Sequence, residues 1–146
     1  MILLSRTIHF NAAHRLWNPA KGEAWNRATF GDAAGPSGYG HNYALEVSVA
    51  GPVDAEDGML LNLTDLDRIL KEEVDRPLDH RNLNAEIPEF ARTVPTAENL
   101  ARWIWDRVSA RVAAEGRGCR LALMTLRVTP SFAVELADPS LPAVRG

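Results

Sequence analysis

The stretch Ile2-Leu-Leu-Ser-Arg-Thr-Ile-His-Phe-Asn-Ala-Ala-His14 alternates between apolar and polar side chains. The apolar residues fall mainly on the even positions, which is the period of a strand with one buried face. His14 shares the parity of the apolar residues, so we expect its side chain to point inward at the end of the strand. His9 falls on the polar face.

A second strand is predicted from Tyr39 to Ala50, because Tyr43 and every second residue after it are apolar. Tyr39 and His41 are two residues apart, so both side chains leave the same face of this strand. Residues 15–40 are rich in Gly, Pro, Asn and Asp and show no periodicity, which predicts a long loop. Long ordered loops in compact domains are often functional.

Two helices are predicted after the second strand. The first begins at Asn62 or Thr64 and is ended by Pro77, and the second opens at Pro95 and Thr96. Their apolar positions recur at helical spacing, namely Leu66, Ile69, Leu70 and Val74 in the first helix and Leu100, Ile104, Val108 and Val112 in the second.

Two further strands are predicted near residues 120–129 and 132–136. The order of two strands, two helices and two strands favours an α+β fold. We therefore expect a four-stranded antiparallel sheet with two helices packed on one face.

The composition is that of an ordinary globular protein, and its 146 residues predict one domain spanning 1–146. A formal net charge of −3 gives no basic surface for nucleic acid or for an anionic membrane. The single cysteine, Cys119, allows no internal disulfide and is interpreted as a packing residue. With no signal peptide and no membrane span in the sequence, the expected location is the cytoplasm.

His14 and His41 are candidate metal ligands, although two inward histidines alone are more often hydrogen-bonded pocket residues. Catalytic zinc usually takes three protein ligands and a water. Tyr39 occupies the third place by strand parity, but a neutral phenol is a poor zinc ligand. A carboxylate such as Asp32 would have to complete the site.

Asp79 and His80 are adjacent and form a second candidate group. A carboxylate can fix the tautomer of an imidazole and raise its basicity, which suits a general base. Adjacent side chains meet in this way only where the backbone turns, and the alternative is a turn whose aspartate bonds local backbone. Among the four tryptophans, Trp103 and Trp105 are expected to pack on the sheet, whereas Trp17 and Trp25 flank the long loop and could line a pocket.

Taken together, six segments occur in the order and spacing of one known family. The chain resembles the 6-pyruvoyl-tetrahydropterin synthase and 6-carboxytetrahydropterin synthase family over about residues 4–136. The segments are Phe10-Asn-Ala-Ala-His-Arg-Leu16, Gly40-His-Asn-Tyr43, Asn62-Leu-Thr-Asp-Leu66, Pro77-Leu-Asp-His-Arg-Asn-Leu83, Pro95-Thr-Ala-Glu-Asn-Leu100 and Thr129-Pro130.

The resemblance implies a tunnelling fold, in which three subunits close a twelve-stranded barrel and two trimers stack into a hexamer. It places the active sites between subunits. It also implies a small-molecule substrate, since family enzymes act on dihydroneopterin triphosphate. Zinc binds the side-chain hydroxyls of that substrate, and a cysteine abstracts protons.

Carried over residue by residue, the resemblance matches His14 and His41 to zinc ligands and Asp79-His80 to the catalytic pair. Thr96 matches a pocket threonine. Three other positions depart from the family pattern: the third zinc ligand is Tyr39, the cysteine is Ala33, and the glutamate that anchors the pterin is Val128.

These departures predict a divergent lyase, cyclase or isomerase with an altered substrate and a role in secondary metabolism. Its catalytic residues are predicted to be Asp79, His80, Tyr39 and His41, and its substrate-binding residues Thr96, Val128 and Trp25. Two alternatives stay open. One is a zinc-dependent 6-pyruvoyl- or 6-carboxytetrahydropterin synthase with a modified site at His14 and His41, and the other is a non-catalytic ligand-binding protein.

Overall fold

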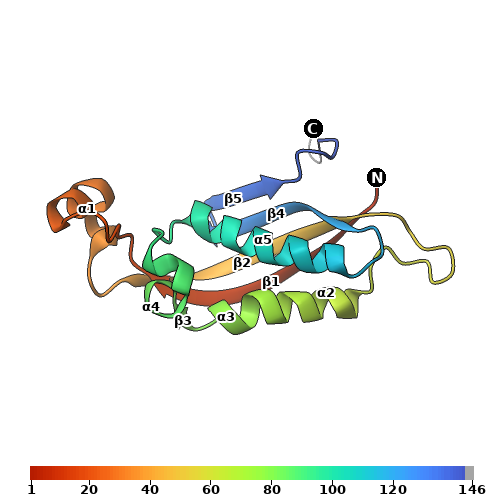
Figure 1. The fold of residues 1–146 in the computed structure, drawn as a ribbon, viewed down its shortest axis with the longest axis horizontal. Helices are drawn as coiled ribbons and strands as arrows, with labels where there is room; N and C mark the ends of the chain where they lie inside the picture. The colour runs from red at the N-terminus through yellow and green to blue at the C-terminus, as the bar shows by residue number, and fades with distance from the viewer. Residues whose placement is uncertain (144–146) are drawn as a thin grey trace.

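Four long antiparallel strands form the body of the sheet in the computed structural model, which describes residues 1–143 (Figure 1). They are β1 (Leu3–His14), β2 (Tyr39–Ala50), β4 (Arg120–Thr129) and β5 (Phe132–Ala137). The order across the sheet is β3-β1-β2-β4-β5. The α+β class and the four antiparallel strands are as predicted.

A fifth, two-residue strand changes the predicted sheet from purely antiparallel to mixed. β3 (Arg81–Asn82) pairs parallel to β1 at Ala12 and Ala13. Two hydrogen bonds hold the preceding residues against the same edge: the His80 N–H donates to the Asn11 carbonyl at 2.6 Å, and the Asn11 N–H donates to Asp79 Oδ1 at 2.8 Å. The sheet expected to have four strands therefore has five, because this connection is fastened to the edge of β1.

The first predicted helix is one helical segment made of α2 (Leu63–Leu70), the π turn η2 (Lys71–Asp75) and α3 (Arg76–Leu78). Its predicted cap is Asn62, whose side chain accepts from the Thr64 N–H at 2.9 Å. The prediction that Pro77 ends the helix was wrong by one residue, because Pro77 lies within α3 and the segment ends at Leu78. In the π turn the Arg76 N–H bonds to a carbonyl five residues back, and Pro77, which has no N–H, follows within the same turn.

The second predicted helix is α5 (Ala97–Ala114), capped by Thr96, whose hydroxyl accepts from the Asn99 N–H at 3.2 Å. α5 and the α2–α3 segment run along one face of the sheet (Figure 1). Both predicted apolar stripes are buried between the helices and the sheet. The opposite face is polar, with Ser5 bonded to Ser48 across the strands at 2.7 Å.

The predicted long loop contains a short α-helix, α1 (Glu23–Phe30), followed by a 3₁₀ turn, η1 (Gly31–Ala34). Both project from one end of the sheet (Figure 1). Asn26 organises this segment from a fully buried position, since its amide donates to the carbonyls of Asn18, Lys21 and Gly22. Because the buried residue of α1 is an amide and not an apolar side chain, the helix shows no periodic pattern of apolar residues and was not predicted. Two short turns, α4 (Leu83–Glu86) and η3 (Pro88–Ala91), precede α5.

Within residues 1–143, the structure has no helix long and apolar enough to cross a membrane.

Candidate active site

Three aromatic side chains converge where β1 and β2 reach the α1 end of the sheet. His14 pairs with Tyr39 across the two strands, and His41 follows two residues later on the same face. The ring centroids lie 4.9 Å apart for His14 and Tyr39, 5.5 Å for His14 and His41, and 5.3 Å for Tyr39 and His41. The strand parity seen in the sequence therefore brings all three rings together.

These rings form one wall of a cavity of about 420 Å³. The first turn of α5 and the end of β4 form the other walls. Besides the three rings, the lining residues are Leu16, Tyr43, Thr96, Ala97, Glu98, Val128, Thr129 and Phe132. The cavity is mostly apolar, with a few polar groups at the start of α5, which is the usual character of a small-molecule site.

His14 is held in one tautomer by the backbone. Its Nδ1 lies 2.7 Å from the Pro95 carbonyl oxygen, which can only accept, so the proton is on Nδ1. Nε2 therefore carries a lone pair. That nitrogen is buried and has no hydrogen-bond partner among the described residues. An unpartnered acceptor of this kind is oriented to receive a proton, a hydrogen bond or a metal ion.

Burial also sets the charge of the three rings. It lowers the pKa of His14, where the bond to Pro95 opposes the shift, and it lowers the pKa of His41. It raises the pKa of the Tyr39 phenol. At neutral pH these three rings are therefore two neutral imidazoles and one protonated phenol.

The donor set does not fit a three-ligand zinc site. His14 Nε2 is oriented as a ligand nitrogen would be, because its other nitrogen donates to a carbonyl. The third neighbour is a phenol whose pKa is raised, and a protonated phenol is a poor zinc ligand. Residues 1–143 hold no group of three His, Cys, Asp or Glu side chains placed to bind a metal. Asp32, exposed in η1, thus does not complete the histidine pair, contrary to one expectation.

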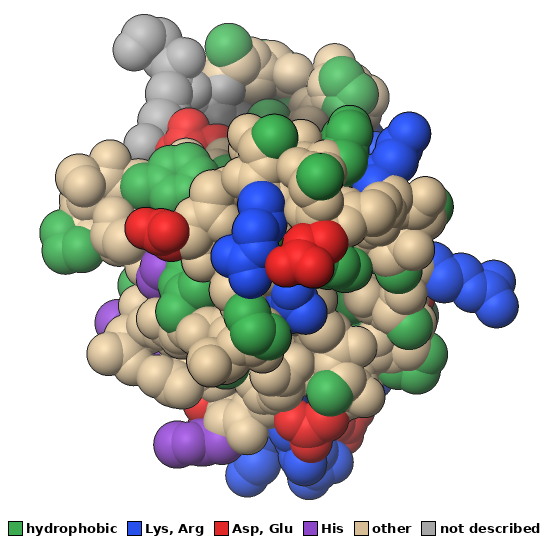
Figure 2. Space-filling model, turned by 90° about the vertical axis from the view of Figure 1, so that its left-hand side faces the viewer, with side chains coloured by type: hydrophobic (Ala, Val, Ile, Leu, Met, Phe, Trp, Pro, Cys, Tyr) green, Lys and Arg blue, Asp and Glu red, His purple; other side chains and the backbone are tan. Residues whose placement is uncertain are grey.

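Asp79 and His80 lie at the outer edge of β1, outside the cavity. The backbone of His80 is left-handed, with φ of 59°, and this turn brings its Nε2 within 3.5 Å of Asp79 Oδ2. The side chain of His80 is 83% exposed. Figure 2, which views the end that carries α1, shows histidine side chains reaching the surface at separate places. The two residues can form the predicted dyad, but within one chain it faces solvent.

Comparison with known proteins identifies the family of this fold. Residues 3–137 match the family described as 6-pyruvoyl tetrahydropterin synthase. The chain belongs to the 6-pyruvoyl tetrahydropterin synthase family. It is 43% identical over 105 residues to the 6-pyruvoyl tetrahydrobiopterin synthase of Homo sapiens, covering 72% of each chain.

Two further relatives extend the comparison. A solved structure of the Caenorhabditis elegans 6-pyruvoyl tetrahydropterin synthase superposes with a TM-score of 0.84 at 31% identity, covering 94% of this chain and 95% of that one. The dihydroneopterin monophosphate aldolase of Pyrococcus furiosus is 31% identical over 114 residues, covering 78% of this chain and 81% of the relative. The relatives of this 6-pyruvoyl tetrahydropterin synthase family member thus include enzymes named for different pterin reactions.

The other residues predicted for the site divide into two groups. Thr96 and Val128 line the cavity. Trp25 is not among its lining residues; it lies on α1 with its ring edge-on to Phe30, at 5.9 Å between centroids. The Ala33 carbonyl accepts from the N–H of Leu16, a lining residue, at 2.8 Å, so Ala33 lies close to the rim.

Six lining residues of the cavity in this family member were not predicted as site residues, namely Leu16, Tyr43, Ala97, Glu98, Thr129 and Phe132. Glu98 lies in the first turn of α5, two positions after the pocket residue Thr96. Leu16 and Phe132 reach the cavity from a loop and from a strand start, where no periodicity indicates which way a side chain points.

The depressed pKa of His14 predicts a stability that falls with acidification. The unfolded chain takes up a proton at the ordinary histidine pKa of about 6.5, which the folded chain resists. The free energy of unfolding should therefore decline as pH falls below about 6.5 and level off below the folded pKa. His14→Asn keeps a donor for the Pro95 carbonyl but removes the titrating ring, so we expect a shallower decline.

Urea denaturation between about pH 5 and pH 8, in the presence of a chelator, measures this slope. His9→Asn is the matched control, because His9 is exposed on the polar face of β1 and should leave the slope unchanged. Equal slopes in the wild type and His14→Asn would contradict the prediction.

Proposed function

We propose that this protein is a divergent lyase, cyclase or isomerase of the family, acting on a small molecule less polar than a pterin. In this proposal acid–base groups take the place of the zinc–cysteine pair. The observation that carries it is the cavity itself: His14, Tyr39 and His41 converge with one zinc-binding nitrogen too few, and Val128 is 5% exposed in the wall.

Within the cavity, His14 Nε2 and the Tyr39 hydroxyl have complementary roles. The free lone pair of His14 accepts a proton from a hydroxyl or from a carbon next to a carbonyl, and the protonated phenol donates to the substrate oxygen. His41, a neutral imidazole, supplies a second acceptor or donor. Together these groups can move protons without any net oxidation, which suits isomerisation, elimination and ring closure.

The walls support a less polar substrate. The family's pterin-anchoring glutamate corresponds to Val128, so the pterin's paired donors would meet an apolar side chain there. A site with such paired hydrogen bonds prefers its substrate over an analogue that lacks them by about 10⁴-fold or more, and this preference is lost with the bonds. Thr96 and Glu98 remain as polar contacts at the start of α5.

The oligomer completes the proposal. We infer the family's tunnelling fold for a single domain spanning residues 1–146, of which 144–146 lie outside the described part. Three subunits would close a twelve-stranded barrel, and two trimers would form a hexamer. Association would pair β5 of a neighbour with the part of the β1 edge that β3 leaves open, which covers the exposed sheet edges.

In that assembly the exposed Asp79–His80 dyad of one subunit would serve the cavity of a neighbour, with His80 as general base and Asp79 orienting it. Neither Asp79 nor His80 lines the cavity of its own chain, and this motivates the assignment. A cytoplasmic location and a role in secondary metabolism complete the proposal.

A second candidate, the zinc-dependent synthase with a modified site, is favoured by one observation. His14 Nε2 is buried, unpartnered and oriented through Nδ1 like a ligand nitrogen. In this alternative, His14 and His41 would hold the metal together with Tyr39 as phenolate.

One pair of measurements separates the two candidates. Metal content of the purified protein and conversion of dihydroneopterin triphosphate are measured beside the human relative. We expect zinc well below one ion per chain and conversion lower by roughly 10³-fold or more. Stoichiometric zinc that disappears in both His14→Asn and His41→Asn, together with conversion near that of the human enzyme, would overturn the proposal in favour of the zinc synthase.

A further inference from the structure

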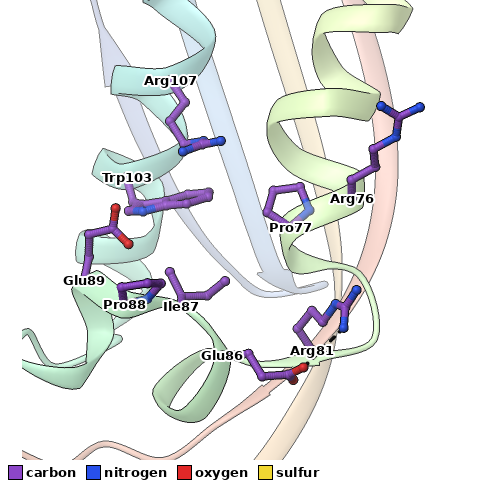
Figure 3. A pocket seen from close by; sticks show the side chains of 9 residues that line it. All are labelled: Arg76, Pro77, Arg81, Glu86, Ile87, Pro88, Glu89, Trp103 and Arg107. Carbon is purple, nitrogen blue, oxygen red and sulfur yellow. Dashed lines mark hydrogen bonds and ion pairs between the residues drawn. The ribbon is translucent and has the colours of Figure 1, made fainter.

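We propose that the helical side of the molecule carries a second, separate binding site, for a flat organic anion such as an aromatic carboxylate. The site is a cavity of about 460 Å³ between α3, the β3–α4–η3 segment and α5 (Figure 3). It shares no lining residue with the cavity at His14. Its volume lies within the range of about 300–1,000 Å³ that is usual for small-molecule sites.

The α5 wall consists of a tryptophan and an arginine that stack on each other. The Arg107 guanidinium lies over the Trp103 ring, 4.5 Å from its centroid. Arg107 Nη2 also pairs with Glu73 Oε2 at 2.8 Å, which holds the guanidinium flat against the indole. Arg107 Nε is buried without a hydrogen-bond partner among the described residues. This wall is therefore rigid and retains positive charge near the cavity.

The opposite wall supplies two more cations. The exposed side chain of Arg76 makes no hydrogen bond or ion pair within the described part of the chain, so its donors are free to receive a ligand. Its charge also acts on Glu72, whose pKa it helps to lower. Arg81 Nη1 contacts Glu86 Oε1 at 3.2 Å, and the other oxygen of Glu86 accepts the Asn82 N–H at 2.6 Å. Glu86 is thus already occupied.

The balance of charge favours an anion. Three guanidinium groups and the carboxylates of Glu86 and Glu89 line the cavity. Arg107 is already paired with Glu73, so the cations that face a ligand are Arg76 and Arg81. In Figure 3, Glu89 lies on the Trp103 side, across the cavity from Arg76 and Arg81. A carboxylate placed between Arg76 and Arg81 would therefore meet donors on both sides and no competing acceptor except the occupied Glu86. Charge-assisted hydrogen bonds of this kind are the stronger ones.

The shape of the cavity selects a flat apolar body behind that anion. The Trp103 ring and the Pro77 ring lie on opposite sides of the opening, and Ile87 and Pro88 line the wall between them (Figure 3). Proline and tryptophan are stiff side chains, so the slot exists before a ligand binds and costs little ordering. In our proposal an aromatic ring lies between them, with its carboxylate toward Arg76.

The test uses benzoate as the probe, with phenyl phosphate and neutral benzyl alcohol as parallel arms. Protein labelled with 5-fluorotryptophan gives one ¹⁹F resonance for each of its four tryptophans. The signal that disappears in Trp103→Phe assigns Trp103. We expect benzoate to shift the Trp103 signal saturably with a Kd of about 1 mM, and benzyl alcohol to bind at least about tenfold more weakly. Tighter binding of phenyl phosphate than of benzoate would assign the site to phosphate monoesters rather than carboxylates and overturn the choice of carboxylate.

Variants on the two walls locate the site. Arg76→Gln should weaken benzoate by about tenfold. Because Arg76 is exposed, the variant should fold normally. Arg102→Gln is the matched control, since Arg102 is an exposed cation of α5 outside the lining. The absence of any saturable Trp103 shift, or an equal loss in Arg102→Gln and Arg76→Gln, would overturn the proposal.

Discussion

Replacing Tyr39 by histidine is expected to raise the zinc affinity of the cavity by at least about 100-fold. Residues that only orient a zinc ligand change metal affinity by about 10–100-fold, so a third ligand nitrogen should contribute no less. The site is prepared for it, because His14 Nε2 is already unpartnered and the rings of His14 and His41 are 5.5 Å apart. A histidine at position 39 would leave β2 on the same face as His41.

Competition with a chromophoric chelator measures this affinity. Tyr39→Phe is the control for loss of the phenol, and it should leave zinc affinity at the wild-type level. Adding His14→Asn to the Tyr39→His protein should abolish the gain, since it removes Nε2 and keeps the bond to Pro95. Wild-type protein that already binds zinc as tightly as Tyr39→His would show that the phenol is an adequate ligand and that our donor argument is wrong.

Restoring three residues at once is expected to recover the family reaction. The variant Ala33→Cys, Tyr39→His, Val128→Glu should convert dihydroneopterin triphosphate at least about 100-fold faster than the wild type, because a positioned base alone contributes about 10²–10⁴-fold. Val128 lines the cavity, and Ala33 bonds to Leu16 at its rim. Each substitution therefore acts in or beside the same cavity.

Product formation by chromatography measures the gain. The control carries serine at position 33 in the same background, because a hydroxyl is a far weaker base than a thiolate. We expect that control to stay near the wild-type rate while binding zinc normally. A triple variant that folds and binds zinc, yet converts no more than the wild type, would show that the divergence of this chain lies at other positions.

Much of the fold was predictable from local patterns. Alternation placed β1 and β2 within a residue of their observed limits, and the caps at Asn62 and Thr96 marked two helix starts. These features depend on neighbours within a few residues, so a short window of sequence contains their cause. The parity of β1 and β2 also predicted the meeting of His14, Tyr39 and His41.

The missed features depend on contacts between distant segments. β3 exists because Asp79 and His80 bond to the edge of β1 at Asn11, a partner 68 residues from Asp79. α1 is organised by the buried amide of Asn26 and not by an apolar stripe. Neither arrangement produces a periodic pattern of apolar residues in the sequence.

The sequence by itself determined which residues share the site's strand face and which family residues are absent from it, because side-chain parity and residue identity are local properties. Only the tertiary structure decided what those residues can do. The carbonyl that fixes the tautomer of His14 belongs to Pro95, 81 residues away, and the burial that keeps the imidazoles neutral comes from packing against α5 and β4. Protonation and orientation depend on the surroundings of a group, and those surroundings form only when distant parts of the chain meet.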